Sequence, residues 1–281
     1  MAKRIEASAC RELIESKRFF VLDMDGTVTL GGAPLEGAVE LVSYLRSADK
    51  QLVFLTNNSS KSTDTYLGKL RSVGFAVERG QILTSNEATA RFLQEHYPGK
   101  SVCFLGTFDA ASEMKAFGIP LVLPFDRNQG QQVEVAVLAY DTGLTYEKLK
   151  NFCHQLRSKI PFVATHPDLV CPSPEGPLPD VGSFMELIFS ATGRRPDFVV
   201  GKPESHMVQQ LLAEKKISPD QTLIIGDRLY TDIEMGIRLG IQTLLVLSGE
   251  TDEQMLSTAT IQPDFVVDSV GELVKLACER G

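Results

Sequence analysis

Long hydrophobic segments are missing from this sequence of 281 residues. The longest apolar runs, around residues 135–140 and 244–247, suit a strand but are far too short to cross a bilayer. Residues 1–13 are polar and charged, and they lack the apolar stretch of a signal peptide. We therefore expect a cytoplasmic protein with no membrane partner.

Positive charge is also scarce. The chain has 28 lysines and arginines against 36 acidic residues, a formal net charge of −8. An acidic chain without basic clusters is poorly suited to bind nucleic acid or an anionic membrane. A small phosphorylated substrate is still compatible with this charge, because one metal ion and one lysine can reverse the local field.

Cysteine and histidine are few and scattered. The five cysteines form no CxxC pair, and the four histidines form no cluster. An odd number of isolated cysteines argues against a disulfide framework, and the spacing argues against a zinc site. Any metal centre in this chain is therefore expected to use oxygen ligands.

Short apolar runs alternate with amphipathic helical patterns along the chain. This alternation predicts βαβ units and an α/β fold with a doubly wound parallel sheet. Helical spacing occurs at residues 39–45, 66–70 and 208–212. The runs that predict strands are 19–22, 52–55, 198–200, 222–225, 243–247 and 265–267.

The middle of the chain shows the same alternation of apolar runs and helical patterns, as a separate block. Strands are predicted at 101–105, 134–138 and 161–165, with a helix at 146–156. The proline-rich segment 172–179 is predicted to be a hinge or linker. These patterns predict three parts: residues 1–82 and 183–281 as two halves of a core, and 83–182 as an inserted α/β unit.

The strongest chemical signal is the acid pair Asp23 and Asp25, which follows the apolar run 19–22 and precedes Gly26. In an open parallel sheet, ligands bind beyond the carboxyl ends of the strands. Two neighbouring carboxylates repel each other unless a cation lies between them. The alternative interpretation is an ordinary Asp-Gly turn, which the partners below disfavour.

Three other strand ends carry polar groups of related chemistry. Thr56, with the amides around Asn57 and Asn58, can hold phosphoryl oxygens, although a helix-capping loop is the simpler interpretation. Lys202 supplies a point charge for phosphate or is a solvated turn lysine. Asp227 can bind a metal directly. Asp232 can support that site or favour a helix dipole.

Together, these four segments offer several carboxylates, one lysine and one hydroxyl. Magnesium prefers oxygen ligands in octahedral array and usually keeps waters and a substrate phosphate. The sequence therefore predicts a Mg²⁺ site at one edge of the sheet.

The ordered set Asp23-x-Asp25-Gly26-Thr27, Thr56, Lys202 and Gly226-Asp227 with Asp232 resembles the four motifs of the haloacid dehalogenase (HAD) superfamily. Residues 55–59, 164–168 and 226–232 are most similar to its NagD and p-nitrophenylphosphatase branch. The resemblance implies a Rossmann-like core with an inserted cap and a phosphatase activity.

The resemblance also implies residue roles. Asp23 is expected to be the nucleophile that forms an aspartyl-phosphate, and Asp25 the general acid and base. Magnesium is expected to be held by the Asp23 carboxylate, the Asp25 carbonyl and Asp227, with Asp232 supporting it. The residues expected to bind the substrate are Thr56, Asn57, Asn58 and Lys202 in the core and His166 and Asp168 in the cap. For His166, a polar residue at the end of a cap strand is an equally strong interpretation.

Two other functions remain open at this stage. A phosphotransferase or phosphomutase would use the same aspartyl-phosphate with another acceptor. A phosphoacceptor signalling module is disfavoured by the length of the chain and by the second acid at position 25. The sequence does not identify the substrate among small phosphomonoesters, and the resemblance leaves a homodimer as one option.

Overall fold

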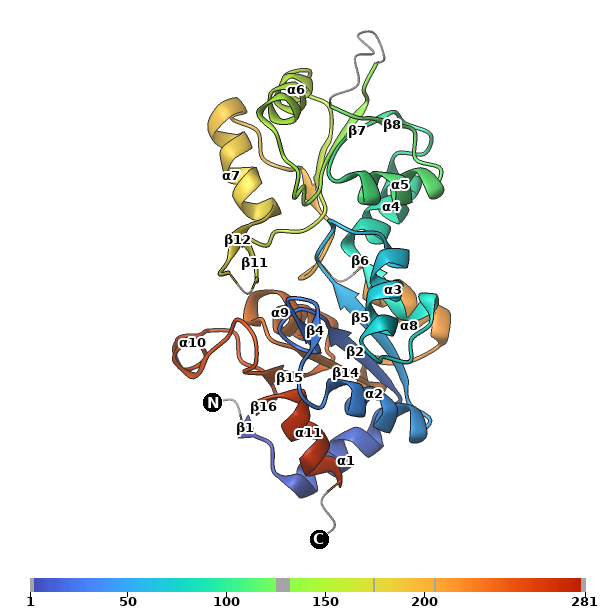
Figure 1. The fold of residues 1–281 in the computed structure, drawn as a ribbon, viewed down its shortest axis with the longest axis vertical. Helices are drawn as coiled ribbons and strands as arrows, with labels where there is room; N and C mark the ends of the chain where they lie inside the picture. Colours follow the sequence, from blue (N-terminus) through green and yellow to red (C-terminus); the bar gives the residue numbers. More distant parts are fainter. Residues whose placement is uncertain (1–2, 125–131, 174, 205, 279–281) are drawn as a thin grey trace.

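The computed structural model describes residues 3–124, 132–173, 175–204 and 206–278, and these residues form two lobes (Figure 1). The first and last described elements, β1 (Lys3–Arg4) and α11 (Val270–Cys278), both lie in the lower lobe. None of the described helices is both long and apolar enough to span a membrane.

The lower lobe, which we call the core, is built on a parallel sheet. Its described strands are β1 (Lys3–Arg4), β2 (Phe19–Asp23), β5 (Gln51–Thr56), β6 (Ile82–Thr84), β14 (Thr222–Gly226), β15 (Gln242–Val246) and β16 (Phe265–Val267). They pair in the order β1-β16-β15-β14-β2-β5-β6. The strands β2 and β14, each buried along its whole length, therefore lie side by side at the centre.

Helices cover both faces of the core sheet because successive side chains of a buried strand alternate in direction. Phe20 and Leu22 pack with the helices of one face, and Phe19 and Val21 with those of the other. The first face carries α1 (Ala7–Ser16), α2 (Ala38–Ser47), α3 (Thr63–Ser72) and α11 (Val270–Cys278). The second carries α8 (His206–Lys215) and α9 (Glu234–Leu239).

Short elements complete the core. Helix α10 (Glu253–Thr258) packs near β16 through Leu256. Three helical turns precede regular elements: η1 (Arg79–Gln81), η2 (Pro219–Gln221) and the π-helical turn η3 (Leu229–Ile233). A hairpin of β3 (Thr29–Leu30) and β4 (Ala33–Pro34) follows β2 directly.

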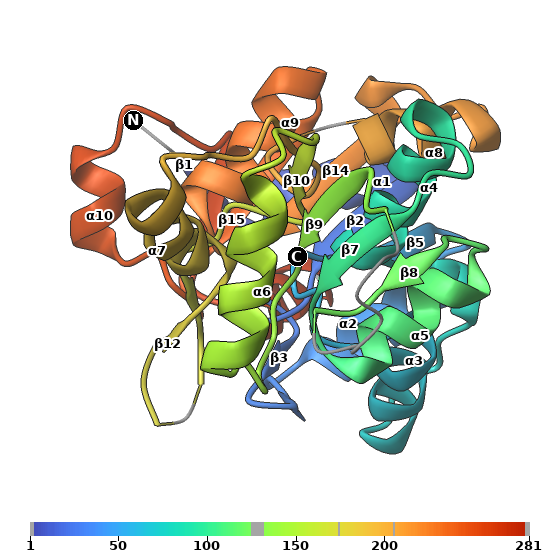
Figure 2. The same ribbon diagram turned by 90° about the horizontal axis from the view of Figure 1, so that it is seen from above.

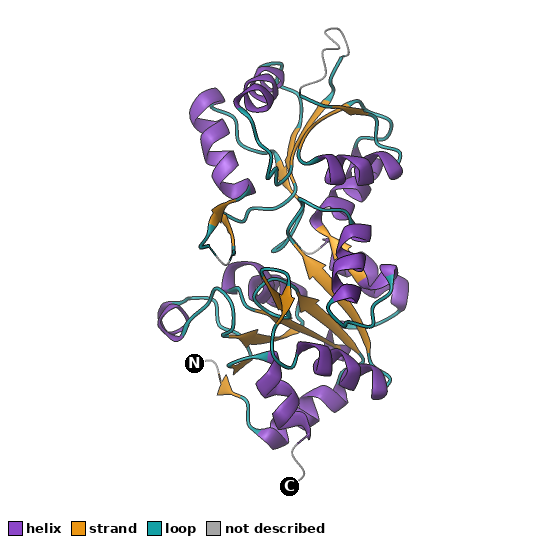
Figure 3. Cartoon of the chain, viewed as in Figure 1, coloured by secondary structure: helices purple, strands orange, loops and turns teal. Residues whose placement is uncertain are grey.

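The upper lobe, which we call the cap, has its own parallel sheet in the order β13-β10-β9-β7-β8. Its strands are β7 (Val102–Leu105), β8 (Leu121–Val122), β9 (Val135–Leu138), β10 (Phe162–Ala164) and β13 (Phe198–Val199). Figure 2 shows this sheet between two pairs of helices, and Figure 3 shows the same layering in both lobes. The pairs are α4 (Ser85–His96) with α5 (Phe108–Ala116), and α6 (Tyr146–Leu156) with α7 (Val181–Thr192).

The structure corrects two sequence predictions. Residues 198–200 were predicted as a core strand, but β13 pairs in parallel with β10 of the cap. The cap sheet therefore extends beyond residue 182, the predicted end of the insert. Segment 172–179 is not a linker between the lobes. Its end forms β12 (Leu178–Pro179), which pairs with β11 (Val170–Cys171) in a hairpin of the cap. Pro174 lies outside the described residues.

Candidate active site

The two central strands of the core bring Asp23 and Asp227 to one edge of the sheet. Asp23 is the last residue of β2, and Asp227 directly follows β14. Leu22 is level with Ile225 in the parallel register, so both chains leave the sheet at the same height. Thr56 ends β5 on the other side of β2. This convergence is what the strand-end argument predicts for an open parallel sheet.

Three carboxylates meet at this edge. Oxygen atoms of Asp23, Asp227 and Asp232 all lie within 4.8 Å of one another, and all three residues are buried. Asp227 Oδ2 accepts a hydrogen bond from the Glu250 amide at 2.7 Å. Asp227 Oδ1 is buried with no hydrogen-bond partner among the described residues. Burial, and then the charges of Asp23 and Asp232, raise the pKa of Asp227 well above its ordinary value.

Those carboxylates fit a divalent cation. A buried oxygen without a donor is costly, and a cation would satisfy it while removing the repulsion among the three acids. Gly26, at φ +98°, lies so close that a side chain there would collide with the Asp227 carboxylate. The donor set is all oxygen, which suits Mg²⁺.

Lys202 lies between two of the three acids. Its Nζ contacts the Asp23 carboxylate and donates to Asp232 Oδ1 at 2.7 Å. Burial alone would lower the pKa of Lys202, but the two carboxylates raise it above its ordinary value. Burial raises the pKa of Asp232 to about 6 despite the opposing effect of Lys202. Lys202 therefore remains a buried cation beside Asp23.

Lys202 reaches the site from the cap and not, as predicted, from the end of a core strand. It follows β13 by three residues, in the segment that leads from the cap sheet to α8. The Asn57 side chain holds this segment, because Asn57 Oδ1 accepts from the Lys202 amide at 2.8 Å and Asn57 Nδ2 donates to the Lys202 carbonyl at 3.1 Å. A side chain on Gly201 would collide with Asn57 and the Thr165 carbonyl.

The second acid of the pair takes a different position. Asp25 lines the cavity at this edge, and its Oδ1 accepts from Thr29 Oγ1 at 3.4 Å. Its side chain is not among the carboxylate oxygens that cluster around Asp227. Thr56 also lines the cavity, and its Oγ1 accepts from the Asn58 amide at 3.1 Å. Asp25 is thus available for chemistry that the metal cluster does not use.

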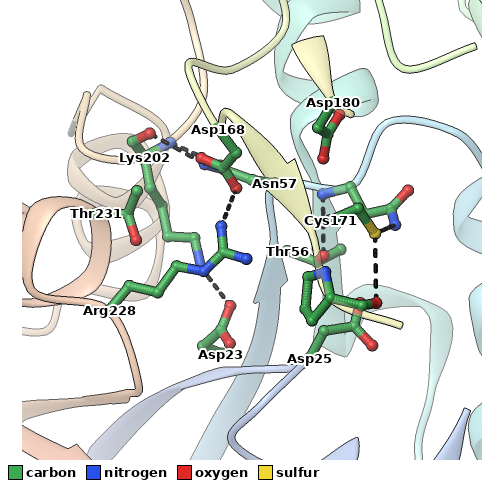
Figure 4. Close-up of a pocket in the computed structure, with 12 residues that line it drawn as sticks. Asp23, Asp25, Thr56, Asn57, Asp168, Cys171, Asp180, Lys202, Arg228 and Thr231 are labelled. Atoms are coloured by element: carbon green, nitrogen blue, oxygen red, sulfur yellow. Dashed lines mark hydrogen bonds and ion pairs between the residues drawn. The ribbon is translucent and has the colours of Figure 1, made fainter. Parts of the chain in front are cut away.

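Core and cap close over a small cavity, shown in Figure 4. From the cap, Asp168 enters its wall. Asp168 Oδ1 accepts from Asn57 Nδ2 at 2.9 Å, and Oδ2 accepts from Arg228 at 2.7 Å. The predicted residues that line the cavity are Asp23, Asp25, Thr56, Asn57, Asn58, Asp168 and Lys202.

His166 does not line the cavity, and its position therefore argues against a direct contact with the substrate. Its side chain is fully buried behind Asp168 and Asp180, with Nε2 at 3.5 Å from Asp180 Oδ1 and Nδ1 at 3.9 Å from Asp168 Oδ2. Neither ring nitrogen has a hydrogen-bond partner among the described residues. Its burial favours the other interpretation, a polar residue at the end of a cap strand, and burial depends on packing between distant segments that a local motif does not reveal.

Five lining residues were missed as site residues: Arg228, Thr231, Cys171, Pro172 and Asp180. Arg228 directly follows Asp227, and its position at the end of a buried strand was a usable signal. It pairs with Asp168 at 2.7 Å and with Glu250 at 2.9 Å while 7% exposed. Cys171 and Asp180 flank the proline-rich segment 172–179, which the sequence predicts to be a hinge or linker, so the local pattern did not identify them as site residues.

Comparisons with known proteins agree with this geometry. Residues 20–120 match the family described as haloacid dehalogenase-like hydrolase, and residues 199–273 match a HAD-hydrolase-like family. The chain is similar to a 4-nitrophenylphosphatase from Thermotoga maritima, with 38% identity, a TM-score of 0.87, and coverage of 94% of this chain and 99% of that one.

Two further relatives span most of the chain. The sugar-phosphatase AraL of Bacillus subtilis is 31% identical, over 92% of this chain and 93% of its own. A glycerol phosphate phosphatase from Mycobacterium tuberculosis, solved in complex with magnesium, is 28% identical with a TM-score of 0.84, over 94% of this chain and 78% of its own. The chain therefore belongs to the haloacid dehalogenase-like hydrolases, as a phosphatase of the branch that includes NagD and the p-nitrophenylphosphatases.

Proposed function

We propose that this protein hydrolyses small phosphomonoesters through a covalent phosphoryl-Asp23 intermediate, with Mg²⁺ as cofactor. The observation that carries the proposal is the convergence of Asp23, Asp227 and Asp232 around Lys202, beside a cavity that Asp25 also lines. This arrangement places a nucleophile, positive charge and a second acid within one small space.

The metal would be held by the carboxylates of Asp23 and Asp227, with the Asp25 carbonyl as a further ligand and Asp232 as support. The unpartnered Asp227 Oδ1 supports this assignment. When bound, Mg²⁺ would neutralise charge on the transferring phosphoryl group, which otherwise repels an anionic nucleophile.

In the first step, an Asp23 carboxylate oxygen attacks phosphorus and the bond to the leaving oxygen breaks. Asp25 donates a proton to that leaving oxygen. Lys202 and the groups around Thr56 and Asn57 hold the equatorial phosphoryl oxygens, on which transition-state charge is spread. As the substrate enters, Lys202 must give up part of its contact with Asp23 in order to bind the phosphoryl group.

In the second step, water attacks the phosphorus of phosphoryl-Asp23. Asp25, now a carboxylate, accepts a proton from this water, and the Asp23 carboxylate is released with phosphate. One residue can perform both proton transfers because the first step leaves it in the form that the second requires.

The cavity limits how the substrate enters. Its volume is about 30 Å³, which holds a few water molecules at most and is too small for a phosphomonoester. The lobes must therefore separate to admit substrate, and the contacts of Asp168 with Asn57 and Arg228 are the ones that would open.

Transfer to a second alcohol instead of water is the alternative to hydrolysis, and Asp25 could serve either acceptor. The test is phosphate release from a panel of phosphomonoesters, including p-nitrophenyl phosphate and sugar phosphates, with Mg²⁺ and with chelator. Hydrolysis predicts metal-dependent release with ¹⁸O from labelled water in the phosphate. Release that persists in chelator would contradict the metal assignment, and phosphorylated product without free phosphate would indicate transfer.

A further inference from the structure

Asp180 is a buried carboxylate of the cap that faces the proposed active site. It precedes α7, and its Oδ1 accepts a hydrogen bond from the Val181 amide at 2.7 Å. The residue is 3% exposed and lines the cavity. Its second oxygen, Oδ2, accepts no hydrogen bond from any described residue. In Figure 4, the Asp180 carboxylate points toward the space that Cys171 and Asp25 also border.

We infer that Asp180 selects the leaving group of the substrate. Its carboxylate accepts a hydrogen bond from a hydroxyl or ammonium group on the alcohol side of the phosphomonoester and disfavours an alcohol that carries a second anion. This inference rests on the proposed hydrolysis, because it assigns the alcohol to the side of the cavity where Asp25 would protonate it.

The charges around the cavity support this selection. Among the described lining residues, the cations are Lys202 and Arg228. Lys202 is held by Asp23 and Asp232, and Arg228 by Asp168 and Glu250. With the lobes closed, each cation already has two carboxylate partners, and Lys202 is further assigned to the phosphoryl group, so a second anionic group on the substrate would have to compete for either of them. A carboxylate on the leaving group would be repelled by the Asp180 carboxylate, with no unpaired cation among the described lining residues to offset the repulsion. Such a repulsion is strong at low dielectric.

The wall between Asp180 and Asp25 is neutral. Cys171 and Pro172 line it, and burial raises the pKa of the Cys171 thiol to about 11. Asn58 Nδ2 lies 3.6 Å from Cys171 Sγ. A wall without charge does not compete electrostatically for a donor on the leaving group, so the Asp180 carboxylate is the charged acceptor on that side.

His166 lies behind Asp180 and not in front of it, with its Nε2 at 3.5 Å from the oxygen that already caps α7. The hydrogen bond from the Val181 amide occupies Oδ1 and orients the carboxylate, so Oδ2 is the oxygen left for a ligand in the cavity that Asp180 lines. A hydrogen bond to a charged group contributes about 1.5–3 kcal/mol, which corresponds to roughly a tenfold to hundredfold change in kcat/KM.

Four esters that differ only in their terminal group test the inference: ethyl, 2-hydroxyethyl and 2-aminoethyl phosphate, and phosphoglycolate. The wild-type enzyme should prefer the hydroxyl and ammonium esters over ethyl phosphate, and phosphoglycolate should be the poorest. In D180N, the ammonium ester should lose about tenfold or more of its advantage over ethyl phosphate, and phosphoglycolate should improve. Comparing the hydroxyl and ammonium esters identifies which donor the enzyme prefers.

D252N is the matched control, because Asp252 likewise caps a helix, α10, by accepting from the Met255 amide at 2.7 Å. Asp252 is exposed and does not line the cavity. If D180N unfolds, D180S retains a hydroxyl for the helix cap. Equal changes for all four esters, or wild-type turnover of phosphoglycolate that matches the hydroxyl ester, would overturn the selection by Asp180. Failure of the wild-type enzyme to hydrolyse any ester, p-nitrophenyl phosphate included, would overturn the proposed function itself.

Discussion

The side-chain amide of Asn57 donates a hydrogen bond of 2.9 Å to the carboxylate of Asp168 and thereby joins the core to the cap. The same amide nitrogen donates to the carbonyl of Lys202. The position of the cap and the position of Lys202 are therefore coupled through one side chain. We therefore expect separation of the lobes at Asp168 to disturb the position of Lys202 beside Asp23.

D168N should weaken this closure. The substitution removes the charge that pairs with buried Arg228, although Glu250 remains, so we expect a loss of about 1–3 kcal/mol in the free energy of unfolding. KM should rise several-fold, because the closed form is less populated. E204Q, which removes an exposed partner of Arg238, is the control and should change stability by less than about 1 kcal/mol. Equal effects of the two substitutions in denaturant titrations would contradict the coupling.

D23N should abolish turnover. An amide is a far poorer nucleophile than a carboxylate, so kcat should fall by about a thousandfold or more. Circular dichroism should show an intact fold, since Asn fills the same volume and Lys202 keeps Asp232. Phosphate release near the wild-type rate would show that Asp23 is not the nucleophile.

D25N should separate the two proposed steps. p-Nitrophenolate leaves without a proton, so its release in the first step should continue, whereas attack by water on phosphoryl-Asp23 should slow. Stopped-flow absorbance should then show a burst of nitrophenolate in proportion to enzyme, followed by slow turnover. A uniform slowing with no burst would argue against Asp25 as the base of the second step.

D227N should stabilise the metal-free protein and weaken its stabilisation by Mg²⁺. Without metal, D227N should melt at a higher temperature than wild type, because it removes repulsion among three buried acids. Saturation of wild type with Mg²⁺ at 100 times its Kd should contribute about 2.7 kcal/mol, or roughly 5–10 °C. D227N should show a much smaller shift. Equal Mg²⁺ shifts in both proteins, measured by differential scanning fluorimetry, would place the ion elsewhere.

The pH dependence of stability should reveal the buried Asp180. Burial raises the pKa of Asp180 from 3.8 to about 6, against the opposing effect of His166, so between these values the folded state holds a proton that the unfolded state has released. Stability contributed by this residue should therefore be present below about pH 4 and be lost as the pH rises to about 6. The free energy of unfolding of D180N, taken relative to that of wild type, should therefore rise by on the order of 3 kcal/mol between pH 4 and pH 7. A difference that does not change with pH would contradict the raised pKa.

Much of the core could be predicted from the sequence. The strand predicted at 19–22 is β2 (Phe19–Asp23), and the helix predicted at 146–156 is α6 (Tyr146–Leu156). Continuous apolar runs indicate strands buried on both faces, and parallel strands present their carboxyl ends together. For that reason, the convergence of Asp23, Thr56 and Asp227 was predictable from local patterns alone.

Local patterns did not predict which lobe carries Lys202. The apolar run 198–200 predicted a core strand, and a strand is present there, but it belongs to the cap sheet and not to the core. A short apolar strand is compatible with either sheet, and the choice depends on which neighbour it pairs with. Lys202 still reaches Asp23, because the connection between the lobes runs past the end of β2.

By itself, the sequence determined the chemistry of this protein: two acids after one buried strand, two more after another, and a lysine, with no histidine or cysteine cluster. Only the tertiary structure decided which cap residues face that chemistry. Asp180 lines the cavity while His166 is fully buried and does not, although His166 lies in the motif and Asp180 only follows the proline-rich segment 172–179. Burial is a property of packing between segments distant along the chain, and local residue patterns do not contain it.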